Sequence, residues 1–106
     1  MFIHTVFFWF NDKTPAEAAD ALVQDCRDYL GRIPTVRNLW AGRPANTPRD
    51  VVDSSFAVAL TVVLDDRAGH DVYQEHDLHK QFIERNRGHW RRVQVYDCVE
   101  PGTAGY

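Results

Sequence analysis

The chain has too few cysteines to suggest a disulfide framework or a thiolate metal site. It has two, Cys26 and Cys98, which share no CxxC spacing and have no cluster of other metal ligands beside them. Both fall on apolar patterns, so we expect each to be a buried free thiol. Disulfide-stapled and zinc-finger-type domains are therefore not predicted.

A hydrophobic run long enough to cross a bilayer is also missing. The most apolar segment, residues 1–10, is followed by polar residues 11–13 and lacks the basic start of a secretory signal. The net charge is only −3, which gives no reason to expect nucleic acid or another polyanion as a partner. We expect a cytoplasmic protein with no membrane contact.

Common cofactor and nucleophile signatures do not occur: the chain has no GxGxxG, no P-loop and no GxSxG elbow. We therefore expect no bound organic cofactor. What the chain does have is apolar and aromatic residues, which make up 44% and 12% of its 106 positions and are enough for one core. We expect a single domain over residues 1–100 and a C-terminal tail over residues 101–106.

Segments rich in β-branched and aromatic residues predict four strands, at residues 2–10, 36–40, 56–64 and 93–99. The first and third are apolar on both alternating faces, which is typical of strands covered on both sides. Residues 43–55, which contain two prolines, are expected to form a loop between the second and third strands.

Two helical regions are predicted between these strands. Residues 14–17 match a capping box, and an apolar stripe with helical spacing runs from Ala19 to Leu30. A second helical region begins after Asp66 and ends before Gly88. In both regions the apolar residues fall on one side, which predicts helices packed against the sheet.

The resulting order, β-α-β-β-α-β, predicts a ferredoxin-like α+β fold with a four-stranded antiparallel sheet. Two helical regions can cover only one face of such a sheet. The other face is also apolar, and a second copy of the same sheet is the simplest partner for it. We therefore expect a homodimer in which two sheets pair as one α/β barrel.

Several residues in a fixed order resemble the stress-responsive dimeric α/β-barrel (Dabb) family over residues 1–100. They are His4, Ile33-Pro34, Trp40-x-Gly42, the string Tyr73-x-x-His76-x-x-His79-x-x-Phe82, and Val95-Tyr96-Asp97. The resemblance implies the same dimeric barrel. Similarity to a polyketide cyclase of this family further implies an acid/base pair at Tyr73 and His79, with His4 in the pocket.

The chain departs from that cyclase in the wall of the pocket. Val58 stands where the cyclase has a histidine, and Cys26 stands where it has a tyrosine. Asp77 replaces the proline that usually follows the first histidine of the string. Because the acid/base pair is kept while the wall differs, we expect a different substrate.

The chemistry of the pair suits proton transfer next to a carbonyl. A histidine with a pKa near neutrality can remove the proton, and a phenol can hold the developing enolate oxygen. Tyr73 and His79 are six positions apart, so a helix break near residues 76–77 would turn both towards one apolar cavity. The side chains that we expect to contact the substrate are His4, Phe8, Leu22, Cys26, Val58 and His76.

Structural alternatives stay open for the three main residues: Tyr73 as a core aromatic, His79 bonded to a backbone carbonyl, and His4 as a structural histidine. His76 and His79 are spaced to share a metal, but no carboxylate or cysteine clearly completes the shell, so no metal site is expected. A basic cluster near the end of the second helical region suits a solvated helix end, or the docking of an acidic carrier protein or carboxylate. Its members are Arg85, Arg87, Arg91 and Arg92.

The sequence thus favours a cofactor-independent acid/base enzyme acting on a small apolar carbonyl compound. A polyketide cyclase of the aldol type or an isomerase of natural-product biosynthesis fits best. One alternative is a non-catalytic stress-response or small-ligand-binding protein on the same fold. A further alternative, based on fold analogy alone, is a cofactor-independent monooxygenase.

Overall fold

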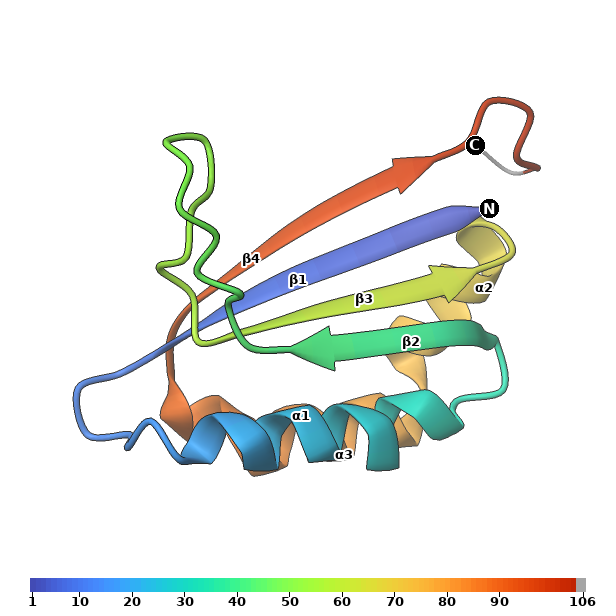
Figure 1. Cartoon of the computed structure of the whole chain (residues 1–106). Helices are drawn as coiled ribbons and strands as arrows, with labels where there is room; N and C mark the ends of the chain where they lie inside the picture. The colour runs from blue at the N-terminus through green and yellow to red at the C-terminus, as the bar shows by residue number, and fades with distance from the viewer. Residues whose placement is uncertain (105–106) are drawn as a thin grey trace.

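The computed structural model describes residues 1–104, which form one antiparallel sheet with helices packed on one face (Figure 1). The strands are β1 (Phe2–Phe10), β2 (Val36–Gly42), β3 (Val58–Leu64) and β4 (Trp90–Val99). Their order across the sheet is β2-β3-β1-β4, which places β1 and β3 in the centre. The predicted ferredoxin-like α+β fold is confirmed.

The helical regions divide into several pieces. They are α1 (Ala18–Asp28), the 3-10 turn η1 (Leu30–Arg32), α2 (Arg67–Glu75), α3 (Asp77–Asn86) and the 3-10 turn η2 (Arg87–His89).

The predicted capping box at the start of α1 is wrong. The Thr14 hydroxyl donates to the Asn11 side chain, and no side chain caps α1 at Glu17. A long-range contact of Thr14 with the His89 carbonyl competes with the local cap.

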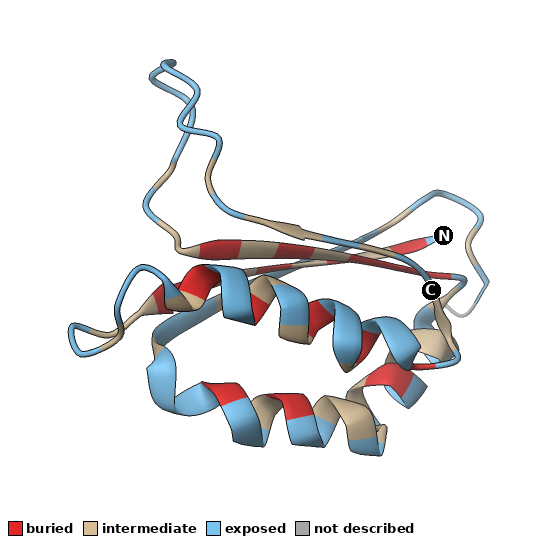
Figure 2. Ribbon diagram, turned by 60° about the horizontal axis from the view of Figure 1, so that its bottom comes forward, coloured by how far each residue is buried: buried red, intermediate tan, exposed pale blue. Residues whose placement is uncertain are grey.

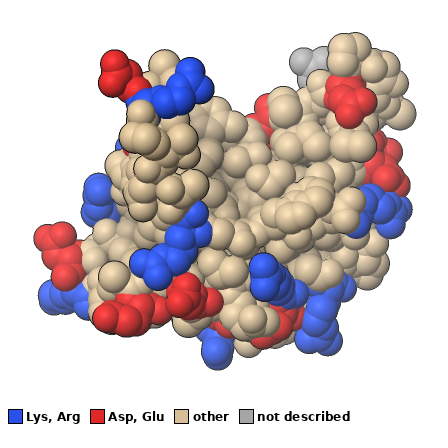
Figure 3. Space-filling model, in the orientation of Figure 1, with Lys and Arg blue, Asp and Glu red and all other residues tan. Residues whose placement is uncertain are grey.

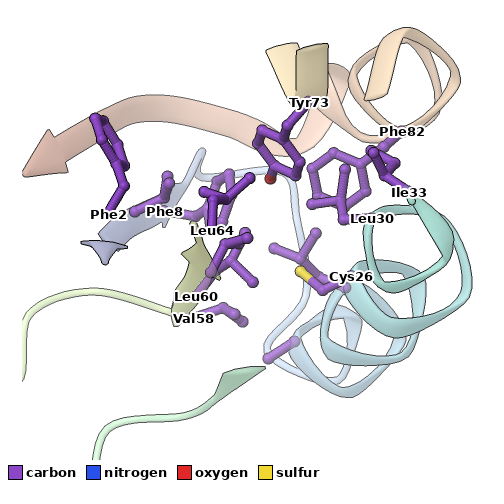
Figure 4. Close-up of a cluster of buried hydrophobic side chains, with 14 residues drawn as sticks. Phe2, Phe8, Cys26, Leu30, Ile33, Val58, Leu60, Leu64, Tyr73 and Phe82 are labelled. Carbon is purple, nitrogen blue, oxygen red and sulfur yellow. The ribbon is translucent and has the colours of Figure 1, made fainter. Parts of the chain in front are cut away.

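The core lies between the sheet and the helices (Figures 2 and 4). Alternate residues of β1 and β3 point into it, and α1 contributes its apolar stripe. The core members of these three elements are Phe2, Val6, Phe8, Val58, Leu60, Val62, Leu64, Ala19, Leu22 and Cys26.

Cys26 is buried as expected, and burial raises the pKa of its thiol to about 12. The same expectation for Cys98 is wrong, because this residue is exposed on the edge strand β4.

The chain ends of the described region meet each other. The Met1 ammonium donates to the Thr103 hydroxyl at 2.8 Å, and that hydroxyl bonds the Glu100 carbonyl at 2.7 Å. Positions 105 and 106 of the expected tail lie outside the described residues. None of the helices in residues 1–104 combines the length and hydropathy that a membrane crossing requires.

The face of the sheet opposite the helices carries uncharged side chains along its middle. A row of paired positions crosses all four strands there: Trp40 faces Thr61, Thr61 faces Thr5, and Thr5 faces Tyr96. The two aromatic ends of this row are 58% and 63% exposed. Charged side chains gather mainly around the margin of the surface in Figure 3, leaving the area over the strands largely uncharged. This face offers a second copy of the chain an uncharged surface with exposed aromatic side chains to bind.

We expect the protein to sediment at micromolar concentration as a dimer of twice the 12.2 kDa chain mass. Tyr96→Asp should weaken that dimer by about tenfold or more, because aromatic residues near an interface centre contribute most of its energy. Val72→Asp places the same charge on an exposed position of α2 and should leave the dimer intact. A folded wild-type monomer at these concentrations would contradict the sheet-to-sheet assembly.

Candidate active site

The second helical region breaks at His76, which joins α2 to α3. Its backbone is extended, with φ −66° and ψ 144°. Its own Nδ1 atom accepts a hydrogen bond from the Leu78 amide at 3.0 Å and so caps the start of α3. The predicted break is therefore present, although Asp77 takes the place of a proline.

The break brings Tyr73 and His79 onto the same side. Their rings meet edge to face with centroids 5.0 Å apart. Tyr73 is fully buried, and its side chain reaches inward from the helix in Figure 4. An unbroken helix would place residues six positions apart only loosely on one side, so the extended residue is what makes the pair possible.

The position of α2 is fixed at its start. The Asp66 side chain accepts from the Gly69 amide at 2.9 Å, the usual role of an N-cap aspartate. The Thr35 hydroxyl donates to the Gly69 carbonyl at 2.9 Å, which ties this turn to the segment before β2. Tyr73 lies one turn further along the helix that these bonds hold.

His4 approaches the pair from the central strand β1. Its ring lies 5.6 Å from that of Tyr73. Asp97 is the directly paired residue on β4, and its Oδ1 atom lies 2.6 Å from His4 Nδ1. Since an ionised carboxylate can only accept, Nδ1 carries the proton. Burial lowers the pKa of His4, and the bond to Asp97 only partly offsets this effect.

These side chains line a cavity of about 140 Å³ between the sheet and the helices α2 and α3. The polar side chains around it are His4, Tyr73, Gln74 and His79. Most of the remaining wall is apolar and comes from β1, β4 and α3. A small apolar space with a few convergent polar groups is the usual form of a ligand site.

The other predicted substrate contacts have mixed positions. Phe8 lines the cavity. Leu22, Cys26 and Val58 are buried in the core cluster but do not line the cavity. His76 is also outside the wall, because its ring is held at the start of α3 by the Leu78 amide. The structure therefore brings together His4, Phe8, Tyr73 and His79, and separates the remaining four.

The protonation states of the pair follow from burial. Burial lowers the pKa of His79 to about 4, and the nearby His4 and His70 rings add to this effect. Burial also raises the pKa of Tyr73 above its usual value. At neutral pH, His79 is consequently a neutral imidazole that can accept a proton, and Tyr73 is a neutral phenol that can donate a hydrogen bond.

Sequence reasoning missed several groups around the site. Asp97 pairs with His4 only through the register of two strands that are distant in sequence. His70 lies one helical turn before Tyr73, with its ring 5.1 Å from that of His4, and this spacing was a signal that could have revealed it. Trp90 also lines the cavity, and its buried Nε1 atom has no partner among the described residues. His4, His70 and Asp97 together have the residue types of a metal site.

The predicted basic cluster does not form one surface. Arg85 bonds Asp25 of α1 at 2.8 Å, on the helix side of the sheet. Arg92 lies on the opposite side, with its guanidinium 4.4 Å from the ring centre of Trp9. Arg85 and Arg92 therefore have separate partners on the two sides of the sheet.

Comparison with solved structures finds this fold in several proteins. A dimeric ferredoxin-like protein of unknown function from Thermobifida fusca is similar, with 16% identity, a TM-score of 0.78, and coverage of 93% of this chain and 90% of the other. A Dabb family protein from Mesorhizobium loti has 19% identity, a TM-score of 0.73, and coverage of 95% and 97%. The hydroxynitrile lyase of Passiflora edulis has 15% identity, a TM-score of 0.77, and coverage of 96% and 94%. At these identities the likeness concerns the fold alone.

Comparison with curated proteins found no significant match. Comparison with protein families did, since residues 2–100 match the stress-responsive A/B barrel domain. This match covers both central strands, the broken helix and the residue pair His4–Asp97. The chain therefore belongs to the stress-responsive A/B barrel domain (Dabb) family.

Proposed function

We propose that the protein is a cofactor-independent acid/base enzyme acting on a small apolar carbonyl compound, as an aldol-type cyclase or an isomerase. The observation that supports this most is the convergence of Tyr73 and His79 on one largely apolar cavity, with ring centroids 5.0 Å apart. One side chain is a proton acceptor and the other a hydrogen-bond donor, the two functions that enolate chemistry requires.

In the proposed mechanism, His79 removes a proton from the carbon next to the substrate carbonyl. The Tyr73 hydroxyl donates a hydrogen bond to the carbonyl oxygen, where negative charge develops. In a cyclase, the enolate carbon then attacks a second carbonyl of the same molecule, and the new alkoxide takes the proton from the His79 imidazolium. In an isomerase, the imidazolium returns the proton to a different carbon.

His4 and Asp97 would position the substrate in this scheme. Asp97 fixes the His4 ring through Nδ1, which leaves Nε2 as a hydrogen-bond acceptor for a substrate hydroxyl. The arrangement also explains why a buried histidine is tolerated on the central strand, because one ring nitrogen already has its partner.

The size of the cavity limits the substrate. Its volume of about 140 Å³ is close to that of the engineered cavity, about 150 Å³, that binds benzene in another protein. The cavity thus fits one six-membered ring, and a larger polyketide would have to displace α2 or α3. The fold itself can carry activity at small molecules, since a similar structure is named as a hydroxynitrile lyase.

A second candidate function is non-catalytic binding of a small ligand in the same cavity. The observation that favours it is the pKa of His79, which burial lowers to about 4. General bases work best when their pKa is near the operating pH. In this alternative, Tyr73 and His79 hold a ligand by hydrogen bonds, and no compound is turned over.

We expect the protein to accelerate exchange of the α-protons of cyclohexanone, a ring-sized ketone, in deuterated water. His79→Ala should lower the rate by roughly 10²- to 10⁴-fold, the usual effect of losing a positioned base. Tyr73→Phe should lower it by about 10- to 10³-fold, because one donor to the enolate oxygen is lost. Proton NMR measures the exchange directly.

The control for this experiment is His89→Ala, since His89 is exposed and outside the cavity. His76→Ala is unsuitable, because losing the cap of α3 would shift His79. Circular dichroism should show that every variant is folded. Full activity in folded His79→Ala would contradict the mechanism. Saturable binding of cyclohexanone without exchange by the wild type would favour the binding alternative.

The pH profile of this exchange should report the lowered pKa of His79. Only the neutral imidazole accepts a proton, so activity should be present at neutral pH and lost as pH falls through about 4. His70→Ala should move the inflection to higher pH, because the His70 ring contributes to the lowering. Rates measured from about pH 3 to about pH 8.5, which extends about one unit below the lowered value of about 4 and about two units above the ordinary value of 6.5, test this. An inflection at the ordinary histidine value in the wild type would show that burial does not control this base.

A further inference from the structure

We propose that His4, His70 and Asp97 form a binding site for a divalent transition-metal ion, for which Zn²⁺ is the probe. Each residue offers one ligand atom, and the three atoms lie within 4.8 Å of one another. Two imidazoles and one carboxylate form a ligand set used for Zn²⁺ and for other first-row ions. Three protein ligands leave a fourth position open, which is the pattern of catalytic rather than structural zinc sites.

The three ligands come from three different elements. His4 lies on β1, Asp97 is its paired residue on β4, and His70 lies on α2 with its ring 5.1 Å from that of His4. Because His4 Nδ1 and Asp97 Oδ1 are only 2.6 Å apart, an ion would take the place of the proton between them. That proton is released to solvent when the metal binds.

The spacing requires only a small adjustment. Ligand atoms about 2.0–2.2 Å from a tetrahedral ion lie roughly 3.3–3.6 Å from each other. Atoms up to 4.8 Å apart reach that spacing when they approach by about 1 Å, and His4 Nδ1 and Asp97 Oδ1, which are 2.6 Å apart, must separate by about 1 Å. Side-chain rotation can supply both adjustments.

His70 also has the surroundings of a metal ligand. One face of its ring stacks on Phe2 with centroids 4.6 Å apart, which limits its orientation. Its Nδ1 atom lies 3.2 Å from a carboxylate oxygen of Asp71. A ligating histidine usually donates its second ring N–H to such a carboxylate, which orients the ring and raises its basicity.

An ion would have access from solvent. A cavity of about 620 Å³ is lined by His70 and Asp97, and the Asp97 side chain is 38% exposed. Arg67 lines the same cavity, so the open position would suit a small anionic ligand such as a carboxylate.

This inference goes beyond the proposed acid/base function and does not depend on it, but the two share His4 and Asp97, because the ion would replace the hydrogen bond by which Asp97 orients His4. Neither Tyr73 nor His79 belongs to the ligand set. The site also differs from the pair His76 and His79, for which the sequence suggested no metal: the Nδ1 atom of His76 already caps α3. Strand register places Asp97 beside His4, and α2 supplies His70.

The test is calorimetric titration of the full chain with ZnCl₂ after treatment with a chelator. The wild type should bind one ion per chain. His70→Ala and Asp97→Asn should each lower the affinity by about 10- to 100-fold or more, since even the loss of an outer partner has effects of that size. His79→Ala and His89→Ala are the matched controls and should keep the wild-type affinity. CoCl₂ should give a visible absorption band that His70→Ala abolishes.

His70→Ala removes an imidazole from a partly exposed helix position, and Asp97→Asn keeps the shape of its side chain, so both should fold. Absence of Zn²⁺ binding to the wild type at micromolar concentration would overturn the proposal. Binding that His70→Ala leaves unchanged, or that His79→Ala abolishes, would overturn it as well. None of these three results would bear on proton exchange by Tyr73 and His79, which is measured without added metal.

Discussion

The candidate site depends on one hydrogen bond, from the Leu78 amide to the His76 imidazole. This bond allows the chain to leave α2, pass through one extended residue and start α3 with its first amides satisfied. The change of direction lets Tyr73 and His79 face each other across 5.0 Å. A continuous helix would have kept more backbone bonds but would have lost the convergence. The break is thus the local feature from which the cavity follows.

The position of the cavity follows from how the helices cover the sheet. The inner residues of the central strands are buried apart from Phe10 at the end of β1. The edge strand β4, by contrast, leaves Val93 and Val95 partly exposed beside the cavity. The helices thus pack more tightly over β3 than over β4, and the cavity forms on the looser side. A buried polar side chain needs a partner, and Asp97 of β4 supplies one to His4 of β1 beside the cavity.

Much of the fold was predictable because strands and amphipathic helices are encoded by local periodicity. The candidate site was less predictable from the sequence than the fold. Asp97 meets His4 across a separation of 93 residues, and no local pattern reports strand register at that range. Periodicity identified Leu22 and Val58 as buried, but it could not tell which buried residues face a cavity. The capping box failed for a related reason, since Thr14 bonds residues outside its own helix.

The low pKa of His79 has a consequence for how such a site would act. Burial and two neighbouring imidazoles disfavour the imidazolium while the cavity holds no charge. An enolate forming beside Tyr73 would change that balance, because a negative charge within contact distance favours the protonated ring in a poorly solvated space. The imidazolium would then be stabilised only when the reaction has created its partner. Stabilisation that exists in the transition state but not in the resting site lowers the barrier rather than tightening substrate binding. A buried histidine that is a weak base at rest is therefore compatible with catalysis, provided that the substrate supplies the counter-charge.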